Sequence, residues 1–293
     1  MLAAFSLVLD TSEFVGLVNT GDDLDLHGLR ICPDLDTITY TLAGLNNPET
    51  GWGLTGETWR VMEELGRLGG ESWFSLGDRD LATHLYRTQR LAQGADLTAI
   101  TAELGAHLGC SVTLLPATNG LMPTRFTSVD GHSMSFQEYF VKHHHGVEIS
   151  HIDLSAANGA VLTEQAHSAL EEATRIIIAP SNPLISIGPL LAIPSVAEIL
   201  RAKRDRVVAI SPIIAGAALK GPADRLMREL GFEASAPGVA SLYAAFASTM
   251  VIDDADGHLR GEVEAAGLRC VVANTIMDGA QVSRALAETV LNA

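Results

Sequence analysis

The chain of 293 residues has the length of one large domain or of two ordinary ones. Apolar residues make up 47% of it and charged residues only 18%, which excludes a disordered or low-complexity chain. Its 19 basic and 35 acidic side chains give a net charge of −16, which argues against binding to nucleic acid or to an anionic membrane, because like charges repel.

Short apolar runs alternate with amphipathic helical patterns, which is typical of an α/β fold with a parallel sheet. The runs rich in Val and Ile are expected to be strands buried on both faces: residues 14–19, 175–179, 206–210, 250–252 and 269–273. Each is followed by a pattern expected to be a helix: residues 34–44, 195–203, 221–230, 259–266 and 278–291.

The middle of the chain has a different pattern. Three helical patterns follow one another, at residues 57–68, 79–91 and 97–108. Three alternating stretches come next, at residues 111–117, 124–129 and 134–141. We therefore expect a single domain (1–293) with its core in residues 1–51 and 151–293. Residues 52–150 are expected to be an inserted cap, mostly helical with a small antiparallel hairpin.

Small polar residues follow the expected strands, in the loops at residues 19–23, 180–183, 211–216 and 220–222. In open parallel sheets, ligands bind beyond the carboxyl ends of the strands, where backbone N–H groups and hydroxyls suit a nucleotide or a phosphate. One such loop alone would be an ordinary turn. Several on the same rim indicate a binding site.

Carboxylates gather in the first part of the chain. Asp22 is expected at a strand end and Asp36 at a helix start, and two carboxylates that face each other there suit Mg²⁺. The neighbouring carboxylates have simpler explanations: Asp34 as a helix N-cap and Asp23 as a solvated turn residue. Arg79, between two acids at a helix start, either binds ligand or makes a structural pair, and the sequence leaves both open.

The three cysteines are far apart and show no CxxC spacing, which predicts neither a disulfide framework nor a zinc site. The apolar runs are shorter than the ~20 residues that a membrane-spanning helix needs. The expected location is the cytoplasm. GxSxG, HExxH and Walker A patterns are also absent from the sequence, so the corresponding hydrolase, protease and P-loop mechanisms lack their residues.

A resemblance to a known family extends from about Val15 to the C-terminus. It is carried, in order, by NTGDD, CPDLDTITYTLAG, GWGLTGETW, LGDRDLATH, LLPAT, FQEYFV, PSNPLISIGPLLAIP, SPIIAG and KGPADRLM. These motifs resemble the 2-phospho-L-lactate transferase family, whose members make the deazaflavin coenzyme F-420. The resemblance implies a Rossmann-like, mostly parallel sheet flanked by helices, with an inserted cap. Members of the family begin with a strand and a GGTGG-like turn, so the resemblance implies that this first strand is missing from the chain.

The resemblance also implies a reaction and a set of site residues. A phospholactyl or phosphoenolpyruvyl group would pass from a guanosine diphosphate-activated donor to the deazaflavin Fo, with release of GMP and with Mg²⁺ as cofactor. Asp22 and Asp36 would bind Mg²⁺ and act in catalysis, and Asp36, Ser75 and Arg79 would bind Fo. The residues implied for the nucleotide are Asn19, Ser181, Asn182, Pro183, Ser211, Gly216, Lys220 and Gly221.

Two other functions remain open from the sequence. One is a non-enzymatic regulator of the gluconeogenesis-factor type, which shares the Rossmann-like core and binds a nucleotide sugar. The other is a nucleotidyl- or glycosyl-type transferase with a different acceptor. The sequence does not identify the three-carbon acid of the donor. Base rates for oligomers favour a homodimer.

Overall fold

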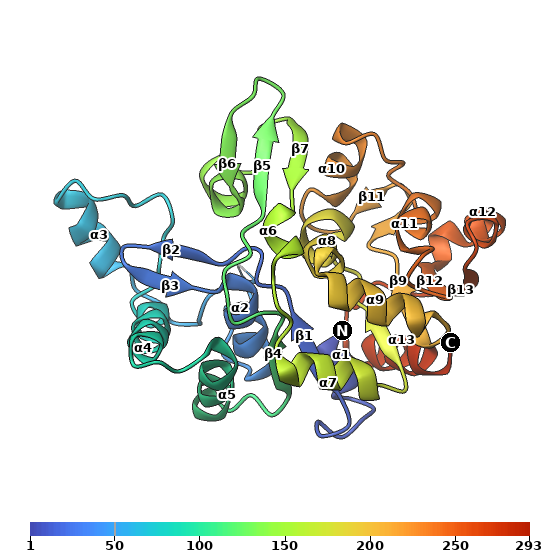
Figure 1. Ribbon diagram of the computed structural model, residues 1–293, viewed down its shortest axis with the longest axis horizontal. Coiled ribbons are helices and arrows are strands. Elements are labelled where there is room, and N and C mark those ends of the chain that lie inside the picture. Colours follow the sequence, from blue (N-terminus) through green and yellow to red (C-terminus); the bar gives the residue numbers. More distant parts are fainter. Residues whose placement is uncertain (50) are drawn as a thin grey trace.

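A four-stranded parallel sheet forms the core of the C-terminal half in the computed structural model, which describes residues 1–49 and 51–293. Its strands lie in the order β13-β12-β9-β8 (Figure 1). Their bounds are β8 (Ile176–Ile178), β9 (Val207–Ile210), β12 (Thr249–Asp253) and β13 (Arg269–Ala273). These are the four C-terminal apolar runs, so the predicted parallel sheet is confirmed.

Side chains of this sheet alternate between two helical layers, as expected for strands buried on both faces. Val207 and Ala209 pack in one core cluster with Val239 and other apolar residues, whereas Val208 and Ile210 pack in another with Val290. The flanking helices are α1 (Leu2–Phe5), α7 (Glu164–Glu172), α9 (Pro194–Ala202), α11 (Ala236–Tyr243), α12 (Arg260–Ala265) and α13 (Ala280–Asn292). The α/β class with helices on both faces is therefore confirmed.

A second parallel sheet pairs β1 (Val15–Val18) with β4 (Thr113–Pro116). The alternating stretch at 111–117 was expected to be part of the cap, and the structure corrects this: β4 is a strand of the parallel core. The reason is burial, since Leu114 packs with Val18 and Leu97 under α2 (Pro33–Leu42) and α5 (Leu97–Leu108).

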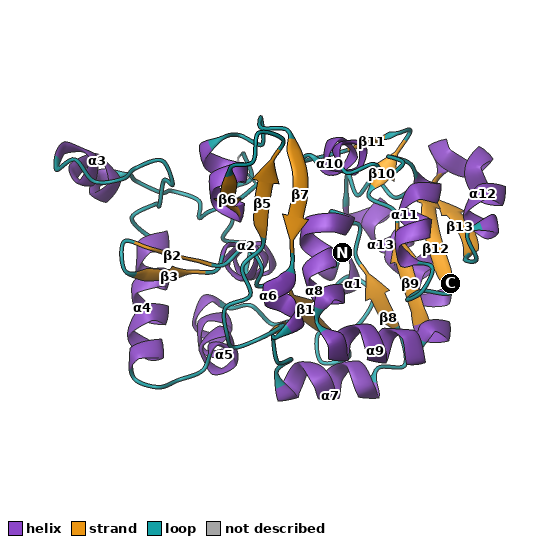
Figure 2. Cartoon of the chain, turned by 45° about the horizontal axis from the view of Figure 1, so that its top comes forward, coloured by secondary structure: helices purple, strands orange, loops and turns teal. Residues whose placement is uncertain are grey.

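The remainder of the 52–150 interval forms two units that project from the core (Figures 1 and 2). One contains α3 (Arg60–Arg67) and α4 (Asp80–Ala92) beside the hairpin of β2 (Leu24–Leu26) and β3 (Leu29–Ile31). The other is an antiparallel sheet in the order β6-β5-β7, with bounds Ser133–Ser135, Arg125–Ser128 and Ile149–Asp153. We call this second unit the hairpin unit.

The last alternating stretch, at residues 134–141, is only partly a strand. The chain leaves β6 and forms a π-helix, η1 (Glu138–Lys142). The main-chain N and the Oγ of Ser135 both donate to Glu138 Oε2, at 2.8 and 2.9 Å, and link β6 to the start of this helix. A second π-helix, η2 (Pro183–Ile187), follows β8. Single π-helical turns are frequent at functional sites.

The other elements are short and connect those above. They are α6 (Ser155–Asn158), α8 (Gly188–Ala192), α10 (Ala223–Glu229), η3 (Arg204–Arg206), η4 (Asp254–Leu259), β10 (Ile213–Ile214) and β11 (Ala217–Ala218). No single helix in the described part of the chain has the length and hydropathy of a membrane span.

Candidate active site

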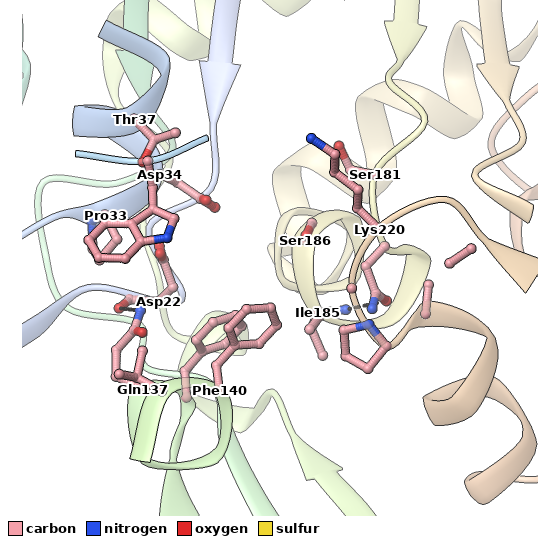
Figure 3. Close-up of a pocket in the computed structure, with 18 of the residues that line it drawn as sticks. Asp22, Pro33, Asp34, Thr37, Gln137, Phe140, Ser181, Ile185, Ser186 and Lys220 are labelled. Atoms are coloured by element: carbon pink, nitrogen blue, oxygen red, sulfur yellow. Dashed lines mark hydrogen bonds between the residues drawn. The ribbon is translucent and has the colours of Figure 1, made fainter. Parts of the chain in front are cut away.

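A cavity of about 960 Å³ lies between the core and the two projecting units. Loops that follow β1, β8, β9 and β13 all contribute to its lining, as the argument from the carboxyl ends of parallel strands predicts. Figure 3 shows two facing sides, with Asp22, Asp34 and Gln137 on one and Ser181, Ser186 and Lys220 on the other. We call the first side the acidic wall and the second the basic wall.

The structure brings most of the sequence-predicted site residues to this cavity. Those that line it are Asp22, Asp36, Ser75, Ser181, Asn182, Ser211, Lys220 and Gly221. Asn19, Arg79, Pro183 and Gly216 are not among its lining residues. The guanidinium of Arg79 donates to the carbonyl of Thr55, and its main-chain N donates to Glu57 at 2.8 Å, so this residue has the structural pairing that the sequence left open.

A tight loop at residues 19–23 carries the first carboxylates. Asn19 Oδ1 accepts from the N of Gly21 at 2.9 Å, while Asn19 Nδ2 donates to Asp34 Oδ2 at 3.2 Å. Asn19 does not line the cavity, but its two hydrogen bonds hold the 19–23 loop and Asp34 in place. Position 21 requires glycine, since a Cβ there would lie 2.7 Å from Thr124 Oγ1.

Among the carboxylates of the acidic wall, Asp22 is the one whose ionised form its surroundings disfavour most. It is 3% exposed, and its Oδ1 has no hydrogen-bond partner among the described residues. Burial, together with the charges of Asp34 and Asp23, raises its pKa well above the ordinary value. A buried acceptor oxygen that faces a cavity without a donor suits a bound cation.

Asp34 and Asp23, which the sequence suggested to be a helix N-cap and a solvated turn residue, have different surroundings in the structure. Cys32, not Asp34, occupies the N-cap of α2, and burial raises the pKa of Asp34 to about 6. Asp23 is not solvated but 6% exposed, and it accepts a hydrogen bond from Cys32 Sγ at 3.1 Å. Burial raises the pKa of Asp23 to about 8. Both expectations are wrong, because α2 begins at Pro33, which puts Asp34 inside the helix, and because Asp23 packs against Cys32.

These raised pKa values predict that the metal-free protein loses stability as the pH rises. The folded protein holds protons on Asp23 and Asp34 that the unfolded chain releases near pH ~4. The contribution of these groups is full below that pH and declines through about 6 for Asp34 and about 8 for Asp23. Urea unfolding in EDTA at pH 5 and pH 8 measures the effect. A double variant, Asp23→Asn with Asp34→Asn, should flatten the profile, and an unchanged slope would contradict this assignment.

Asp36 sits in a buried network with α4. The guanidinium of Arg87, which is 1% exposed, forms an ion pair with Asp36 Oδ1. Nδ1 of His84 lies 3.6 Å from Asp36 Oδ2, and its Nε2 lies 3.3 Å from Asp80 Oδ2. Burial opposes the charge of Asp80, but His84 and the hydroxyl of Tyr40, at 2.6 Å, keep its pKa below the ordinary value.

Two donor sets in the cavity could hold a divalent cation. Asp36, Asp80 and His84 offer ligand atoms within 4.8 Å of one another, which is compatible with a divalent metal. Asp22 and Asp34 form the second set, made of oxygen ligands that Mg²⁺ prefers. Buried atoms without a hydrogen-bond partner among the described residues occur in both sets, at Asp36 Oδ2 and His84 Nε2 and at Asp22 Oδ1. However, the first set is already neutralised by Arg87. The second set therefore fits a hard cation better.

Sequence reasoning missed Asp80, His84 and Arg87 as part of the site. Asp80 and His84 are four residues apart on α4, a spacing that places both on one helix face, so that signal was available. The link from α4 to Asp36 was not available, because it spans 51 residues and depends on how α4 packs.

Serine, asparagine and lysine side chains make the basic wall. Asn182 Oδ1 accepts from the N of Leu184 at 3.0 Å. The Nδ2 of the same side chain has no hydrogen-bond partner among the described residues. Ser211 instead donates its hydroxyl to the carbonyl of Ile213, at 2.9 Å, and closes a turn. Lys220 is exposed and takes part in none of the ion pairs among residues 1–49 and 51–293.

Large aromatic side chains line the remaining part of the cavity. They come from both projecting units and comprise Trp52, Trp73, Phe74, Phe136 and Phe140. The two units meet here, since Lys142 Nζ lies 5.6 Å from the ring centroid of Trp73. The cavity thus has an aromatic, apolar surface beside the acidic and the basic wall.

Comparison with known proteins identifies the family of the chain. The model of the 2-phospho-L-lactate transferase CofD family matches residues 1–285. The chain is 40% identical to a phosphoenolpyruvate transferase of Kitasatospora aureofaciens, over 95% of this chain and 88% of that protein. It is 35% identical to a 2-phospho-L-lactate transferase of Methanosarcina acetivorans, over 99% and 94% of the two chains.

A solved structure supports the fold alone. The crystal structure of a UPF0052-family protein from Bacillus halodurans superimposes with a TM-score of 0.59 at 15% identity and covers 99% of this chain and 95% of its own. From the match of its sequence, the chain belongs to the 2-phospho-L-lactate transferase CofD family and is a transferase that acts on small-molecule substrates.

Proposed function

We propose that the protein transfers a three-carbon phospho-acid group from a guanosine diphosphate-activated donor to a hydroxyl of the deazaflavin Fo, with release of GMP, in coenzyme F-420 biosynthesis. One observation carries the proposal: a single cavity joins an acidic wall, a basic wall and an aromatic surface. These three features suit a metal-bound diphosphate, a nucleotide and a flat ring system respectively.

In this reaction the ribityl hydroxyl oxygen of Fo forms a bond to the phosphorus that bears the three-carbon acid. The bond from that phosphorus to the oxygen shared with GMP breaks, and the hydroxyl proton is lost. Such a displacement depends mainly on positioning and charge neutralisation, so no covalent nucleophile is required. Mg²⁺, when bound, would neutralise the diphosphate and the developing charge on GMP.

Asp22 is the residue best suited to hold the cation, with Asp34 beside it. The sequence expectation pairs Asp22 with Asp36, and Asp36 also lines the cavity. However, Arg87 already neutralises Asp36, whose Oδ2 has no hydrogen-bond partner among the described residues. We therefore assign Asp36 to the acceptor hydroxyl, which it would orient and deprotonate.

The basic wall would bind the diphosphate and the nucleoside. Lys220 supplies a mobile positive charge, and Nδ2 of Asn182 supplies a donor. The aromatic surface would bind the rings of Fo, with Ser75 at its edge. Arg79 would contribute to this side by holding the loop at Thr55 rather than by touching the ligand.

Replacing Lys220 with Glu should weaken nucleotide binding by at least about tenfold, because a charge-assisted contact of ~1.5–3 kcal/mol is lost and repulsion is added. The affinity for Fo should not change, since Lys220 lies on the basic wall, across the cavity from the acidic wall. Calorimetric titration with GDP and, separately, with Fo measures both affinities. If the two affinities fell together, the separate placement of nucleotide and Fo would be wrong.

The transfer itself is tested by supplying Fo with the phosphoenolpyruvyl or the phospholactyl donor and measuring GMP and the mass of the product. The higher identity to proteins named phosphoenolpyruvate transferase favours the enolpyruvyl donor. GMP formation that requires both Fo and Mg²⁺ would support the proposal. Nucleotide binding without turnover of either donor, or GMP release without Fo, would overturn it.

Two expectations concern the protein as a whole. We propose a cytoplasmic location and a homodimeric state, which cell fractionation and sedimentation analysis can each test.

A further inference from the structure

The loop that carries Asp22 is bonded to a side chain 115 residues further along the chain. Nε2 of Gln137 donates to the main-chain oxygen of Asp22 at 3.2 Å. Gln137 is 5% exposed and lies beside Asp22 at the acidic wall (Figure 3). A buried side-chain amide that binds a main-chain carbonyl next to a cavity restrains that part of the backbone.

A second hydrogen bond holds the preceding peptide. The main-chain N of Thr124 donates to the oxygen of Gly21 at 2.8 Å. The oxygens of Gly21 and Asp22 belong to the two planar peptide groups that flank the Cα of Asp22. Fixing both planes fixes the direction of the Cα–Cβ bond between them. Thr124 and Gln137 therefore restrain the backbone from which the side chain of Asp22 enters the cavity.

The carboxylate of Asp22 interacts with the main-chain N–H groups of Asp22 and Asp34, but one of its oxygens stays unpaired among the described residues. This oxygen is Oδ1, and the charges of Asp34 and Asp23 repel the carboxylate. Without a bound cation, a freer backbone would let Asp22 turn away from its neighbours. We infer that Gln137 is a positioning residue that holds Asp22 in the orientation that binds the metal, an inference that rests on the proposed role of Asp22.

The backbone of Gln137 is itself held on both sides by aromatic rings. Phe136 stacks on Phe140, with ring centroids 5.6 Å apart, and Tyr139 stacks on Phe126 at 4.4 Å. Since Phe136 and Phe140 line the cavity, the same short segment carries the aromatic surface and the restraint on Asp22. Rigid support of this kind is what a positioning residue needs.

Direct Mn²⁺ binding, followed by the electron paramagnetic resonance of free Mn²⁺, tests the inference without relying on catalysis. Gln137→Met keeps about the length of the side chain and loses both polar atoms, and Gln137→Ala removes the side chain beyond Cβ. Each should raise the Kd for Mn²⁺ about 10- to 100-fold, as loss of a supporting residue around a metal site does. Raising Mn²⁺ to saturation should restore most of kcat, because the chemistry of the site is unchanged.

The matched control is Met134→Leu, which alters the core of the hairpin unit without touching the 19–23 loop. It should leave the Kd for Mn²⁺ at the wild-type value. If Gln137→Met does not fold, Gln137→Ala decides. If the Gln137 variants and the control weaken Mn²⁺ binding equally, in step with a lower Tm, the role of Gln137 is only structural and the inference is wrong.

Asp22→Asn separates this inference from the proposed function. If Asp22→Asn binds Mn²⁺ as tightly as the wild type, the proposed metal role of Asp22 fails, and the inference about Gln137 fails with it. If Asp22→Asn loses Mn²⁺ binding while both Gln137 variants keep the wild-type Kd, the metal role stands and the inference is overturned.

Discussion

Replacing Asp22 with Asn should nearly abolish transfer activity and at the same time stabilise the metal-free protein. Activity should fall at least about 100-fold, because the bound cation stabilises several kcal/mol of charge in the transition state. Stability should rise because burial and the charges of Asp34 and Asp23 already disfavour the ionised form of Asp22, as its raised pKa shows. Asn keeps the shape of the side chain and removes that charge.

Steady-state assays of GMP release and thermal unfolding in EDTA measure the two effects. Asp25→Asn is the control, since Asp25 is 56% exposed, pairs with Arg30 at the surface and should change stability by no more than ~1 kcal/mol. Asp22→Asn protein with normal activity, or with a lower Tm than the wild type, would contradict our account of this carboxylate.

The largest effect on stability is expected at Arg87. Arg87→Met should lower the free energy of unfolding by about 3–5 kcal/mol, because it leaves Asp36 buried and charged without a partner. It also removes the hydrogen bond that Arg87 donates to the carbonyl of Arg30, at 3.3 Å. Urea unfolding at pH 7 is the measurement.

The same helix offers a matched control. Arg90 pairs with Glu103 at 2.8 Å, but both side chains are about one-third exposed, so Arg90→Met should cost far less stability than Arg87→Met. The double variant Arg87→Met with Asp36→Asn should recover part of the lost stability, because no unpaired charge remains. Equal losses of unfolding free energy for Arg87→Met and Arg90→Met would show that burial of the Asp36–Arg87 pair does not increase the cost of breaking it.

The sequence was most informative where burial on both faces leaves a continuous apolar run. β8, β9, β12 and β13 were predicted for that reason, and the loops after β8 and β9 followed from them. β4 was misassigned because its run, TLLP, begins exposed and ends buried, which also suits a hairpin. Its parallel partner β1 is almost 100 residues earlier, so nothing local distinguishes the two.

Within the candidate site, position along a strand or helix could be predicted and side-chain pairing could not. Asp22, Asp36 and Lys220 were expected near strand ends and helix starts, and the structure places all three at the cavity. Whether Asp36 binds metal depends on its pairing with Arg87, and Asp34 accepts a hydrogen bond from Asn19. Both partners are set by how helices and loops pack, which no spacing in the sequence records.

The contacts around the acidic wall can form only in a fixed order while the chain is being synthesised. Asn19 and Asp34 are 15 residues apart, Asp36 and Arg87 are 51 apart, and Asp22 and Gln137 are 115 apart. At roughly 5–20 residues per second, the ribosome makes Gln137 on the order of 10 s after Asp22. Until then the 19–23 loop lacks the hydrogen bonds from Thr124 and Gln137 that restrain the backbone of Asp22. Metal affinity should therefore appear late in the folding of the nascent chain, after the first helices have formed.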